Sequence, residues 1–363
     1  ETNAYIGTLD WRLLPNYKEL KEKCDISDVD KKTLMDYILT ERQYRRTQIG
    51  GLMVLDLNET PKKKEYIVNR FVPKGQLKLL TGSTGAGKSI FSLQLALSIA
   101  NNESKFLSYK INIPNQKVLF IDTEIGKDIL LRRIASMKEN ITDNGWQTRF
   151  FATTTTGRVE NIYEDIGNAI KDINPDIIFI DCLYNTGRGT RMDKNNDFLN
   201  LADKIDVLNK DKYPDKTFWI IHHFNKGGKI DGITSERTSG ASSIGNWAEN
   251  IMGIDKSGLE DDVRLIRDLK TRDGSESSDH FTMTFTSNLW FDNLQLEPNW
   301  KRHFIDKEKR KKLYMLYDAL KMKADKNNQF VTAMALNLYQ ELDIPESTIK
   351  KYLSQLVEMN LLT

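Results

Sequence analysis

Cysteine is scarce in this sequence, and hydrophobic runs long enough to cross a membrane are lacking. Only Cys24 and Cys182 occur, far apart and without Cys-x-x-Cys or Cys/His ligand spacing. Neither a disulfide framework nor a zinc site is therefore indicated. The longest apolar runs have the length of strands, and no charged-then-apolar leader is visible, so we expect no membrane span and no secretory signal. These absences favour a cytoplasmic protein.

An excess of charge of one sign is also lacking. The 53 Lys and Arg residues nearly balance the 51 Asp and Glu residues, which leaves a formal net charge of +2. A surface that binds nucleic acid must therefore be local rather than spread over the whole protein. With 363 residues, of which 39% are hydrophobic, the chain can bury a sizeable core and hold more than one domain.

The most informative stretch that is present covers residues 76–89. It contains the pattern G-x-x-x-x-G-K-[ST], preceded by an apolar strand and followed by a helix-forming run. Glycine lets such a loop bend so that backbone N–H groups converge on a β-phosphate at the N-terminus of the helix. We expect Lys88 to contact the β- and γ-phosphates of ATP and Ser89 to bind Mg²⁺. The predicted nucleotide-binding residues are Gly82, Ser83, Thr84, Gly85, Ala86, Gly87, Lys88, Ser89 and Ile90.

Short apolar strands alternate with helical segments from about residue 71. This rhythm indicates a parallel sheet covered by helices on both faces. Ligands of such sheets bind at the carboxyl ends of the strands. Three later strands are expected to extend the same sheet in antiparallel fashion. The predicted strands are 77–80, 118–121, 149–153, 176–180 and 217–221, then 263–269, 281–285 and 289–291, and the predicted helices are 88–100, 127–140, 159–173 and 198–209.

Acidic residues follow two of the predicted strands. Asp181 follows the strand over 176–180, where a carboxylate is expected to hold Mg²⁺ through its water opposite the phosphate loop. Asp122 and Glu124 follow the strand over 118–121, where a carboxylate could orient and deprotonate the attacking water. From position alone, either acid could be this general base, and a structural role for both is the alternative.

Two adjacent histidines, His222 and His223, end the fifth predicted strand. Neighbouring residues of a strand point to opposite faces, so at most one of the two can reach the site. That histidine could hydrogen-bond a γ-phosphate oxygen and report its loss to the loop that follows. A histidine buried in the core is the alternative. Metal binding is not expected, because no third ligand has suitable spacing.

Together these motifs resemble the RepA-like branch of the RecA-type ATPases, which includes plasmid-borne hexameric replicative helicases. The resemblance covers about residues 71–292 and implies an α/β fold, a RecA-like P-loop NTPase core with a mostly parallel twisted sheet. It also implies a homo-oligomeric ring, expected to be a hexamer, with Glu124 rather than Asp122 as the base. The motifs that carry it are the phosphate loop, Glu124 followed by Arg132-Arg133, Phe179-Ile-Asp181, His222-His223-x-x-Lys226-Gly-Gly228 and Ser239-Gly-Ala-Ser-Ser243.

Two loops, over residues 184–194 and 226–243, combine cations, small hydroxyls and glycines. Such loops can bind a phosphate backbone without reading base edges. In RecA-like rings the corresponding loops line the channel, so the resemblance implies single-stranded DNA as the partner. Only Tyr184 offers a stacking platform, which predicts salt-sensitive binding; solvated connecting loops are the alternative. The expected DNA contacts are Arg188, Arg191, Lys226, Lys229 and Arg237.

Lys270 and Arg272 stand at the end of a late strand. They resemble the Lys-x-Arg element that many RecA-type rings insert into the ATP site of the neighbouring subunit. A cation delivered across an interface stabilises charge in the transition state, so hydrolysis would depend on assembly. The RepA-like pattern has less than a full Lys-x-Arg here, so this match is to the wider RecA-type pattern. An exposed pair in a turn is the alternative.

The sequence thus predicts three domains: a helical arm over 1–70, the RecA-like core over 71–295, and a helical module over 296–363. The last is consistent with a winged-helix or helix-turn-helix fold that contacts duplex DNA or a replication protein, or with a plain helical cap. We expect a DNA helicase of a plasmid, phage or mobile element that uses ATP and Mg²⁺. A RecA/KaiC-like ATP switch that regulates replication, recombination or transcription without moving on DNA is the main alternative. A small-molecule kinase is the third, and the two cationic loops argue against it.

Overall fold

The chain divides into two units, Glu1–Lys63 and Lys64–Thr363. The computed structural model describes residues 32, 48–49, 52–53, 60, 63–142, 144–154, 162–182, 202–223, 232–237, 244, 246–272, 279–304, 307–324, 332–358 and 362. In the first unit these include one antiparallel pair, β1 (Gln48–Ile49) with β2 (Leu52–Met53). Most of the predicted helical arm over 1–70 lies outside the described residues.

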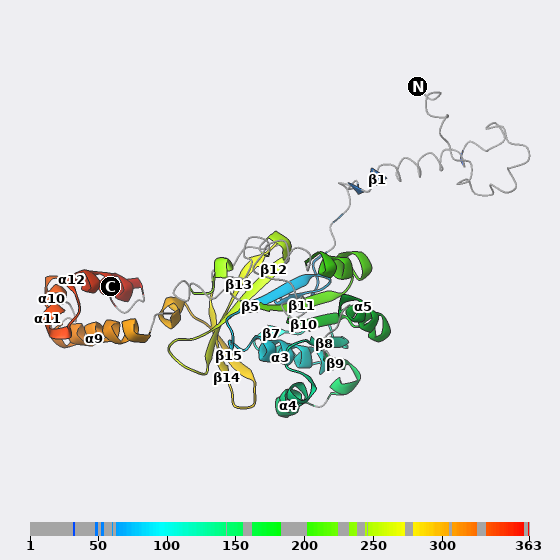
Figure 1. Ribbon diagram of the computed structural model, residues 1–363, viewed down its shortest axis with the longest axis horizontal. Helices are drawn as coiled ribbons and strands as arrows, with labels where there is room; N and C mark the ends of the chain where they lie inside the picture. The colour runs from blue at the N-terminus through cyan, green and yellow to red at the C-terminus, as the bar shows by residue number, and fades with distance from the viewer. Residues whose placement is uncertain are drawn as a thin grey trace, which may run out of the picture. The chain divides into compact units, whose positions relative to one another are not determined.

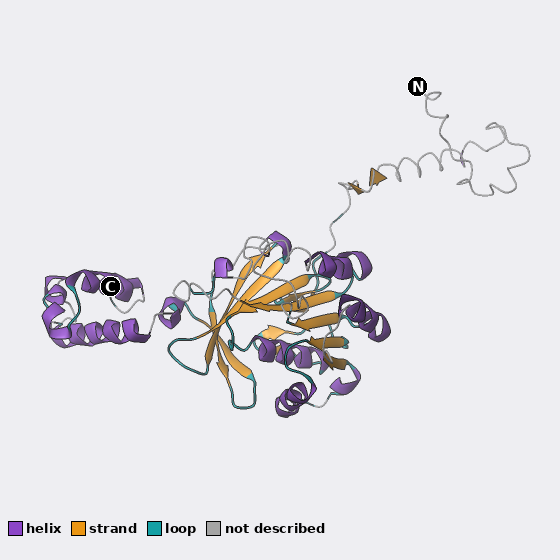
Figure 2. Ribbon diagram, in the orientation of Figure 1, coloured by secondary structure: helices purple, strands orange, loops and turns teal. Residues whose placement is uncertain are grey.

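A nine-stranded sheet forms the centre of the second unit (Figures 1 and 2). Its order is β15-β14-β13-β12-β5-β11-β10-β8-β9, and all pairs from β12 to β9 are parallel. The last three strands along the chain pair antiparallel. The bounds are β5 (Leu77–Gly82), β8 (Val118–Asp122), β9 (Phe150–Thr154), β10 (Ile177–Asp181), β11 (Thr217–His223), β12 (Asn250–Lys256), β13 (Val263–Thr271), β14 (Phe281–Phe285) and β15 (Phe291–Leu296). This confirms the expected α/β fold with a mostly parallel sheet.

The sequence did not predict β12, and it placed the last strand too early, since β15 begins at Phe291. Asn250, Gly253 and Asp255 interrupt the apolar pattern of β12, yet six of its seven residues are buried. It is a strand because β5 on one side and β13 on the other satisfy its backbone hydrogen-bonding groups. Tertiary pairing overrides the local signal here.

Helices cover both faces of the sheet. In β10, Ile177 and Phe179 belong to one apolar cluster and Ile178 and Ile180 to another, as strand alternation requires. The first cluster contains α3 and part of α4, and the second contains α5 and residues 202–208. The bounds are α3 (Lys88–Ala100), α4 (Lys127–Met137) with a short continuation η4 (Lys138–Asn140), α5 (Ile162–Ile173), and a helical stretch from residue 202 that continues as the π-helix η6 (Val207–Lys212).

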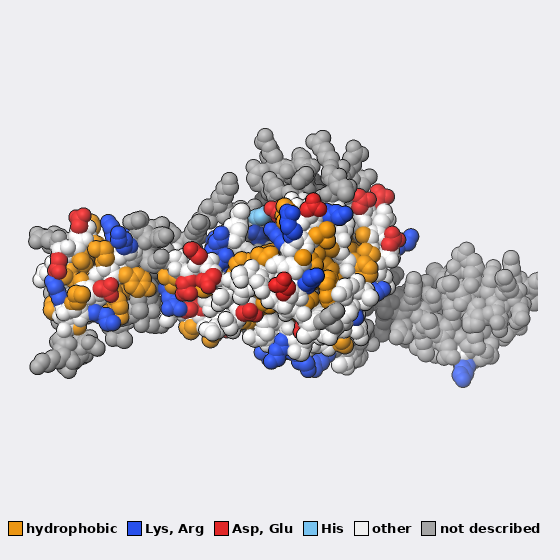
Figure 3. All heavy atoms as spheres, turned by 90° about the horizontal axis from the view of Figure 1, so that it is seen from below, with side chains coloured by type: hydrophobic (Ala, Val, Ile, Leu, Met, Phe, Trp, Pro, Cys, Tyr) orange, Lys and Arg blue, Asp and Glu red, His pale blue; other side chains and the backbone are white. Residues whose placement is uncertain are grey.

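Smaller elements complete this unit. Two hairpins, β3 (Tyr66–Val68) with β4 (Val72–Pro73) and β6 (Lys105–Phe106) with β7 (Tyr109–Lys110), pack on the first apolar cluster through residues such as Phe71 and Phe106. The remaining short helices are η5 (Trp146–Thr148), η8 (Ser235–Arg237) and η9 (Trp300–Phe304). On the face shown in Figure 3, basic and acidic side chains are interspersed, in keeping with the near balance of charge.

The C-terminal helices have an apolar core of their own. They are α9 (Lys307–Lys323), α10 (Thr332–Leu336), α11 (Tyr339–Leu342) and α12 (Glu346–Glu358). Their core contains Leu313, Leu316, Leu320, Ala335, Leu338, Ile344, Ile349, Tyr352 and Leu356. Since the described residues from 307 onward contain no strand, the winged-helix assignment stays a prediction. Among the described residues, no helix has both the length and the apolar character that a membrane span needs.

Gly82 tests the packing of β5 against β12. A Cβ added there would lie 2.1 Å from the carbonyl oxygen of Ile254, so a backbone would have to move. We expect Gly82→Ala to lower the free energy of unfolding by about 2 kcal/mol or more. The control is Gly167→Ala within α5, where the added Cβ would meet Leu208 at an ordinary 3.5 Å; it should stabilise the protein by up to about 1 kcal/mol. Urea denaturation followed by circular dichroism measures both, and a Gly82→Ala variant as stable as the parent would contradict this packing.

Candidate nucleotide-binding site

The phosphate loop joins β5 to α3 at the carboxyl edge of the sheet. Gly87 precedes the helix with φ 96°, a conformation that favours glycine. The first turn of α3 contains no acidic residue, and its N-cap makes no side-chain hydrogen bond. The backbone N–H groups of this turn, with the positive end of the helix dipole, are therefore available to an anion. The local geometry is that of a phosphate-binding helix N-terminus.

Lys88 is buried at this helix start. Its Nζ donates to the carbonyl oxygens of Gly82 and Ser83, both at 2.9 Å. Burial lowers the pKa of the Lys88 ammonium, while the nearby Asp181, Cys182, Glu124 and Asp255 raise it. Two neutral carbonyls are weak partners for a desolvated ammonium. A phosphate group would give this cation a charged partner at the position that the sequence predicted.

Asp181 ends β10 and is almost completely buried. Its carboxylate hydrogen-bonds with Ser89, and its Oδ1 has no hydrogen-bond partner in the described part of the chain. Burial raises the Asp181 pKa from 3.8 to about 7, although Ser89 opposes this shift. A buried carboxylate oxygen beside a hydroxyl fits Mg²⁺, which takes oxygen ligands. Ser89 and Asp181 would hold the ion, directly or through its water, at a place where it would neutralise phosphate charge.

The structure separates the two acids that follow β8. Asp122 is buried, and its carboxylate accepts hydrogen bonds from the backbone N–H groups of Glu124, Ile125 and Gly126 at 2.9 to 3.3 Å. Through these hydrogen bonds, Asp122 stabilises the loop that leads into α4. Glu124 is exposed at the same edge. Of the two acids, Glu124 is the one with a carboxylate directed to the site, and its role as a base stays a prediction.

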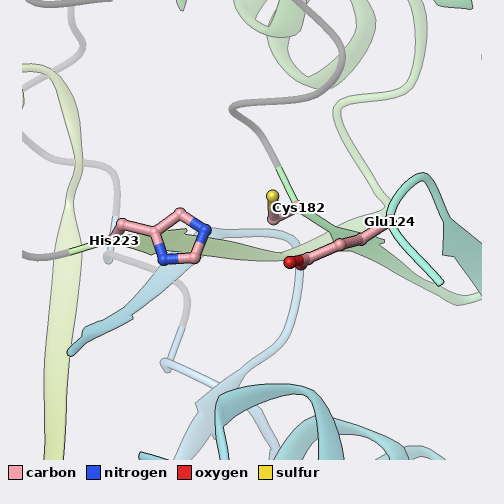
Figure 4. A group of neighbouring side chains, drawn as sticks. All are labelled: Glu124, Cys182 and His223. Carbon is pink, nitrogen blue, oxygen red and sulfur yellow. The ribbon is translucent and has the colours of Figure 1, made fainter. Parts of the chain in front are cut away.

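The two histidines of β11 differ in the same way. His222 is buried in the sheet, whereas His223 is only partly buried. A ring nitrogen of His223, the Sγ of Cys182 and a carboxylate oxygen of Glu124 all lie within 4.8 Å of one another (Figure 4). Burial, and then Lys88, lowers the pKa of His223, while Glu124 raises it. His223 is thus the histidine that reaches the site, and its role as a γ-phosphate sensor stays a prediction.

Cys182 is the site residue that sequence reasoning missed. The sequence shows no ligand pattern around it and predicts no third ligand near the histidines. That expectation is wrong, because Glu124, Cys182 and His223 come from the ends of three neighbouring strands. The available signal was that Cys182 directly follows Asp181, at the end of a predicted parallel strand.

Residues 40–229, more than half of the chain, match the family model described as the AAA domain. The chain belongs to the AAA domain family. With the sheet described above, this indicates a RecA-type P-loop ATPase, a nucleotide-hydrolysing class that generally binds ATP with Mg²⁺. A comparison with curated proteins found no match. Among solved structures, the chain is similar to a KaiC-like protein of the hyperthermophilic archaeon Pyrococcus horikoshii, with 16% identity and a TM-score of 0.48 over 66% of this chain and 100% of that chain.

A partly buried network connects the phosphate loop of this AAA-domain ATPase to β12. Ser83 Oγ donates to Asp255 Oδ1, and Arg237 Nη2 donates to Asp255 Oδ2 at 2.6 Å. The Arg237 and Asp255 side chains are 5% and 8% exposed. The predicted DNA contact of Arg237 is therefore corrected, because its guanidinium is buried in an internal ion pair. Arg188, Arg191, Lys226 and Lys229 lie outside the described residues.

Lys270 and Arg272 lie at the amino ends of the parallel strands, whereas the phosphate loop lies at their carboxyl ends. Register pairs Thr271 with Asn250 and Asn250 with Lys78, at the start of β5, whereas the loop follows Gly82 at its end. Lys78 and Gly82 are four residues apart along β5, which corresponds to about 13 Å along the strand. Lys270 Nζ donates to the Ala248 carbonyl oxygen at 2.8 Å, and Arg272, 53% exposed, lies 3.9 Å from Glu249. These cations are remote from the phosphate loop of their own chain.

Lys256, at the end of β12, is a further cation beside the loop that the sequence did not indicate. A Cβ placed on Gly85 would lie 2.9 Å from its Nζ, so this exposed ammonium stands directly over the turn. No sequence signal could have found it, because β12 itself was not predicted.

Asp181→Asn tests the cost of keeping this carboxylate buried in the ATPase. The pKa of Asp181 is about 7 in the folded protein, against an ordinary value of 3.8. The free energy of unfolding therefore falls as the pH rises from about 4 to about 7. At pH 8, without Mg²⁺ or nucleotide, the neutral variant should be more stable than the parent by about 2–4 kcal/mol. This gain should shrink at pH 5, and Mg²⁺-dependent ATP hydrolysis should be lost.

Urea denaturation at the two pH values measures the effect. The control is Asp122→Asn, which weakens hydrogen bonds to backbone N–H groups and should destabilise the protein at both. Equal stability of the parent and Asp181→Asn at pH 8 would contradict the assigned environment.

Proposed function

We propose that this ATPase assembles into a homo-oligomeric ring, expected to be a hexamer, that couples Mg-ATP hydrolysis to movement on single-stranded DNA. It would be a replicative helicase of the RepA-like kind, working for a plasmid, phage or other mobile element. The observation that carries the proposal is the division of charged groups between the two edges of one sheet. Lys270 and Arg272 lie on the far edge from their own phosphate loop, so a second subunit is needed to bring such cations to a nucleotide.

Within one subunit, the chemistry follows from the carboxyl edge of the sheet. Lys88 and the N-terminus of α3 bind the phosphates, while Ser89 and Asp181 hold the metal ion. Glu124 takes a proton from the attacking water, and Lys88 offsets the charge that develops on the γ-phosphate. His223 hydrogen-bonds that phosphate and loses the contact after hydrolysis. Arg272 of the adjacent subunit supplies the last cation.

Contacts with DNA are assigned to the loops that leave β10 and β11. Arg188 and Arg191 belong to the first loop, and Lys226 and Lys229 to the second. The second loop rejoins the described chain at Gly232, whose carbonyl oxygen accepts a hydrogen bond from Arg237. Arg237 is paired with Asp255, which contacts Ser83 of the phosphate loop. This chain of contacts supports a mechanical connection between the nucleotide and the DNA-binding loop.

The C-terminal module, residues 296–363, would contact duplex DNA or a replication protein. Support comes from α11 and α12, two helices joined through a short turn over residues 343–345 and packed on α9 and α10. The arrangement is compatible with a helix-turn-helix, in which the second helix enters the major groove.

Strand release from a forked DNA duplex is the decisive test. The parent protein with ATP and Mg²⁺ should release a labelled strand, and single-stranded DNA should stimulate hydrolysis. Glu124→Gln should still bind ATP but hydrolyse it at least about 100-fold more slowly and release no strand. Glu139→Gln, which changes an exposed acid outside the site, is the control. Hydrolysis on DNA without strand release would favour an ATP switch, and a monomer whose turnover ignores DNA would favour a small-molecule kinase.

Mixing of variants tests the action of Arg272 across the interface. Lys88→Ala and Arg272→Ala should each lose about 10³-fold in hydrolysis rate, because one lacks the phosphate contact and the other the transition-state cation. Their mixture should recover activity, since Arg272 of a Lys88→Ala subunit can serve the intact phosphate loop of its neighbour.

Arg302→Ala is the matched control, because Arg302 is also partly exposed and paired with a glutamate, at 2.7 Å from Glu297. It should hydrolyse ATP at the parental rate. Two results would rule out the action of Arg272 in the neighbouring site. One is ATP hydrolysis at the parental rate by assembled Arg272→Ala, and the other is a mixture with Lys88→Ala that recovers no hydrolysis.

A further inference from the structure

Three side chains of different chemistry converge at the carboxyl edge of the sheet. Glu124 follows β8, Cys182 follows β10 and His223 ends β11, and these strands are neighbours in the order β11-β10-β8. Figure 4 shows the ring of His223 and the carboxylate of Glu124 turned toward each other with Cys182 between them, and one ligand atom of each lies within 4.8 Å of the other two. Within the described ranges, this is the one group of three such side chains with metal-ligand spacing.

We propose that Glu124, Cys182 and His223 form a binding site for Zn²⁺, separate from the Mg²⁺ position at Ser89 and Asp181. A thiolate, an imidazole and a carboxylate are the three donors that Zn²⁺ takes in proteins, and three protein ligands leave a fourth position open to water or phosphate. Mg²⁺ instead takes oxygen donors and keeps several waters. The sulfur and nitrogen donors therefore select against the ion that ATP brings to the site.

The distances allow such a site with small movements. Zinc–ligand bonds of about 2.0–2.3 Å in a tetrahedron place the donor atoms roughly 3.3–3.7 Å apart. The observed limit of 4.8 Å requires shifts of about one ångström. Cys182 is buried and held by its backbone, which donates to Thr123 Oγ1 at 3.0 Å. Glu124 is exposed, so its carboxylate can turn toward the thiol without disturbing the core.

The local charges permit a second cation. The ammonium of Lys88 acts on His223, and its Nζ is turned to the carbonyl oxygens of Gly82 and Ser83. Three acidic side chains, those of Glu124, Asp181 and Cys182, are close enough to Lys88 to raise its pKa. The acidic groups near Lys88 therefore outnumber it, and those that bind the metal would lose their protons on binding.

Zinc at this position would inhibit hydrolysis without blocking the phosphate loop. It would occupy the carboxylate that takes the proton from water and the imidazole that contacts the γ-phosphate. This consequence rests on the proposed roles of Glu124 and His223, whereas metal binding depends only on the three side chains. The site would make the ATPase sensitive to free zinc.

Cobalt titration of the nucleotide-free 363-residue chain tests the binding itself. Co²⁺ in a tetrahedral site with a thiolate should give a sulfur-to-cobalt charge-transfer band, and Zn²⁺ should abolish it at one equivalent per chain. Cys182→Ser should lose the band, while Cys24→Ser, which removes the other cysteine, should keep it. Excess Mg²⁺ should not compete. Absence of the band, or a band that survives in Cys182→Ser, would overturn the proposal.

Zinc affinity, measured against a chromophoric chelator, gives a second readout from an exposed ligand. Because loss of mere outer-shell partners costs about 10–100-fold in metal affinity, Glu124→Gln should weaken zinc binding at least tenfold. Glu139→Gln should leave it unchanged. Equal affinity in the parent and Glu124→Gln would overturn the assignment of this ligand.

Hydrolysis measurements separate the site from its consequence. Zinc should inhibit the parent at saturating Mg-ATP, a chelator should restore activity, and nucleotide binding should persist. If zinc binds as described but hydrolysis is unaffected, the inhibitory role and the assignment of Glu124 as the base fail, while the metal site remains. If the cobalt band is missing but the forked duplex is unwound, the metal site fails and the helicase remains.

Discussion

The parallel pairing of β5, β11, β10 and β8 is the constraint on which the rest of the structure depends. It aligns His223 with Gly82 and Asp181 with Asp122, so residues from segments that are far apart in the sequence end at one edge. Parallel strands need a crossover between each pair, and the helices of these crossovers bury both faces. The site therefore forms only when the whole sheet forms.

Charged groups are buried at this edge at a cost in stability. Asp181 holds its proton well above its ordinary pKa range because it is desolvated, and Lys88 rests on carbonyl oxygens. Replacing such groups by apolar ones often stabilises a protein, so their presence is evidence of a ligand rather than of stability. Asp255 is different, since Arg237 and Ser83 satisfy it internally. The same edge thus contains a structural network around Asp255 and a second set of groups, Asp181 and Lys88, that are suited to bind metal and phosphate.

The antiparallel extension of the sheet has a separate consequence. Because β13 runs opposite to β12, its end lies at the amino edge of the parallel strands. Lys270 and Arg272 are carried away from the nucleotide of their own chain, which gives the proposed ring a physical basis. A sheet with parallel strands throughout would have brought both cations to the carboxyl edge instead.

The sequence by itself determined the phosphate loop, the alternation of strands and helices, and the positions of Asp181 and the histidine pair, because each is encoded by neighbouring residues. Only the tertiary structure decided what depends on contacts between distant segments. It made β12 a strand through pairing with β5 and β13, buried Arg237 against Asp255, and assigned Asp122 to the loop and Glu124 to the site. It also brought Cys182 to Glu124 and His223. Sequence spacing cannot reveal that cluster, because strand order, and not distance along the chain, decides which strand ends are neighbours.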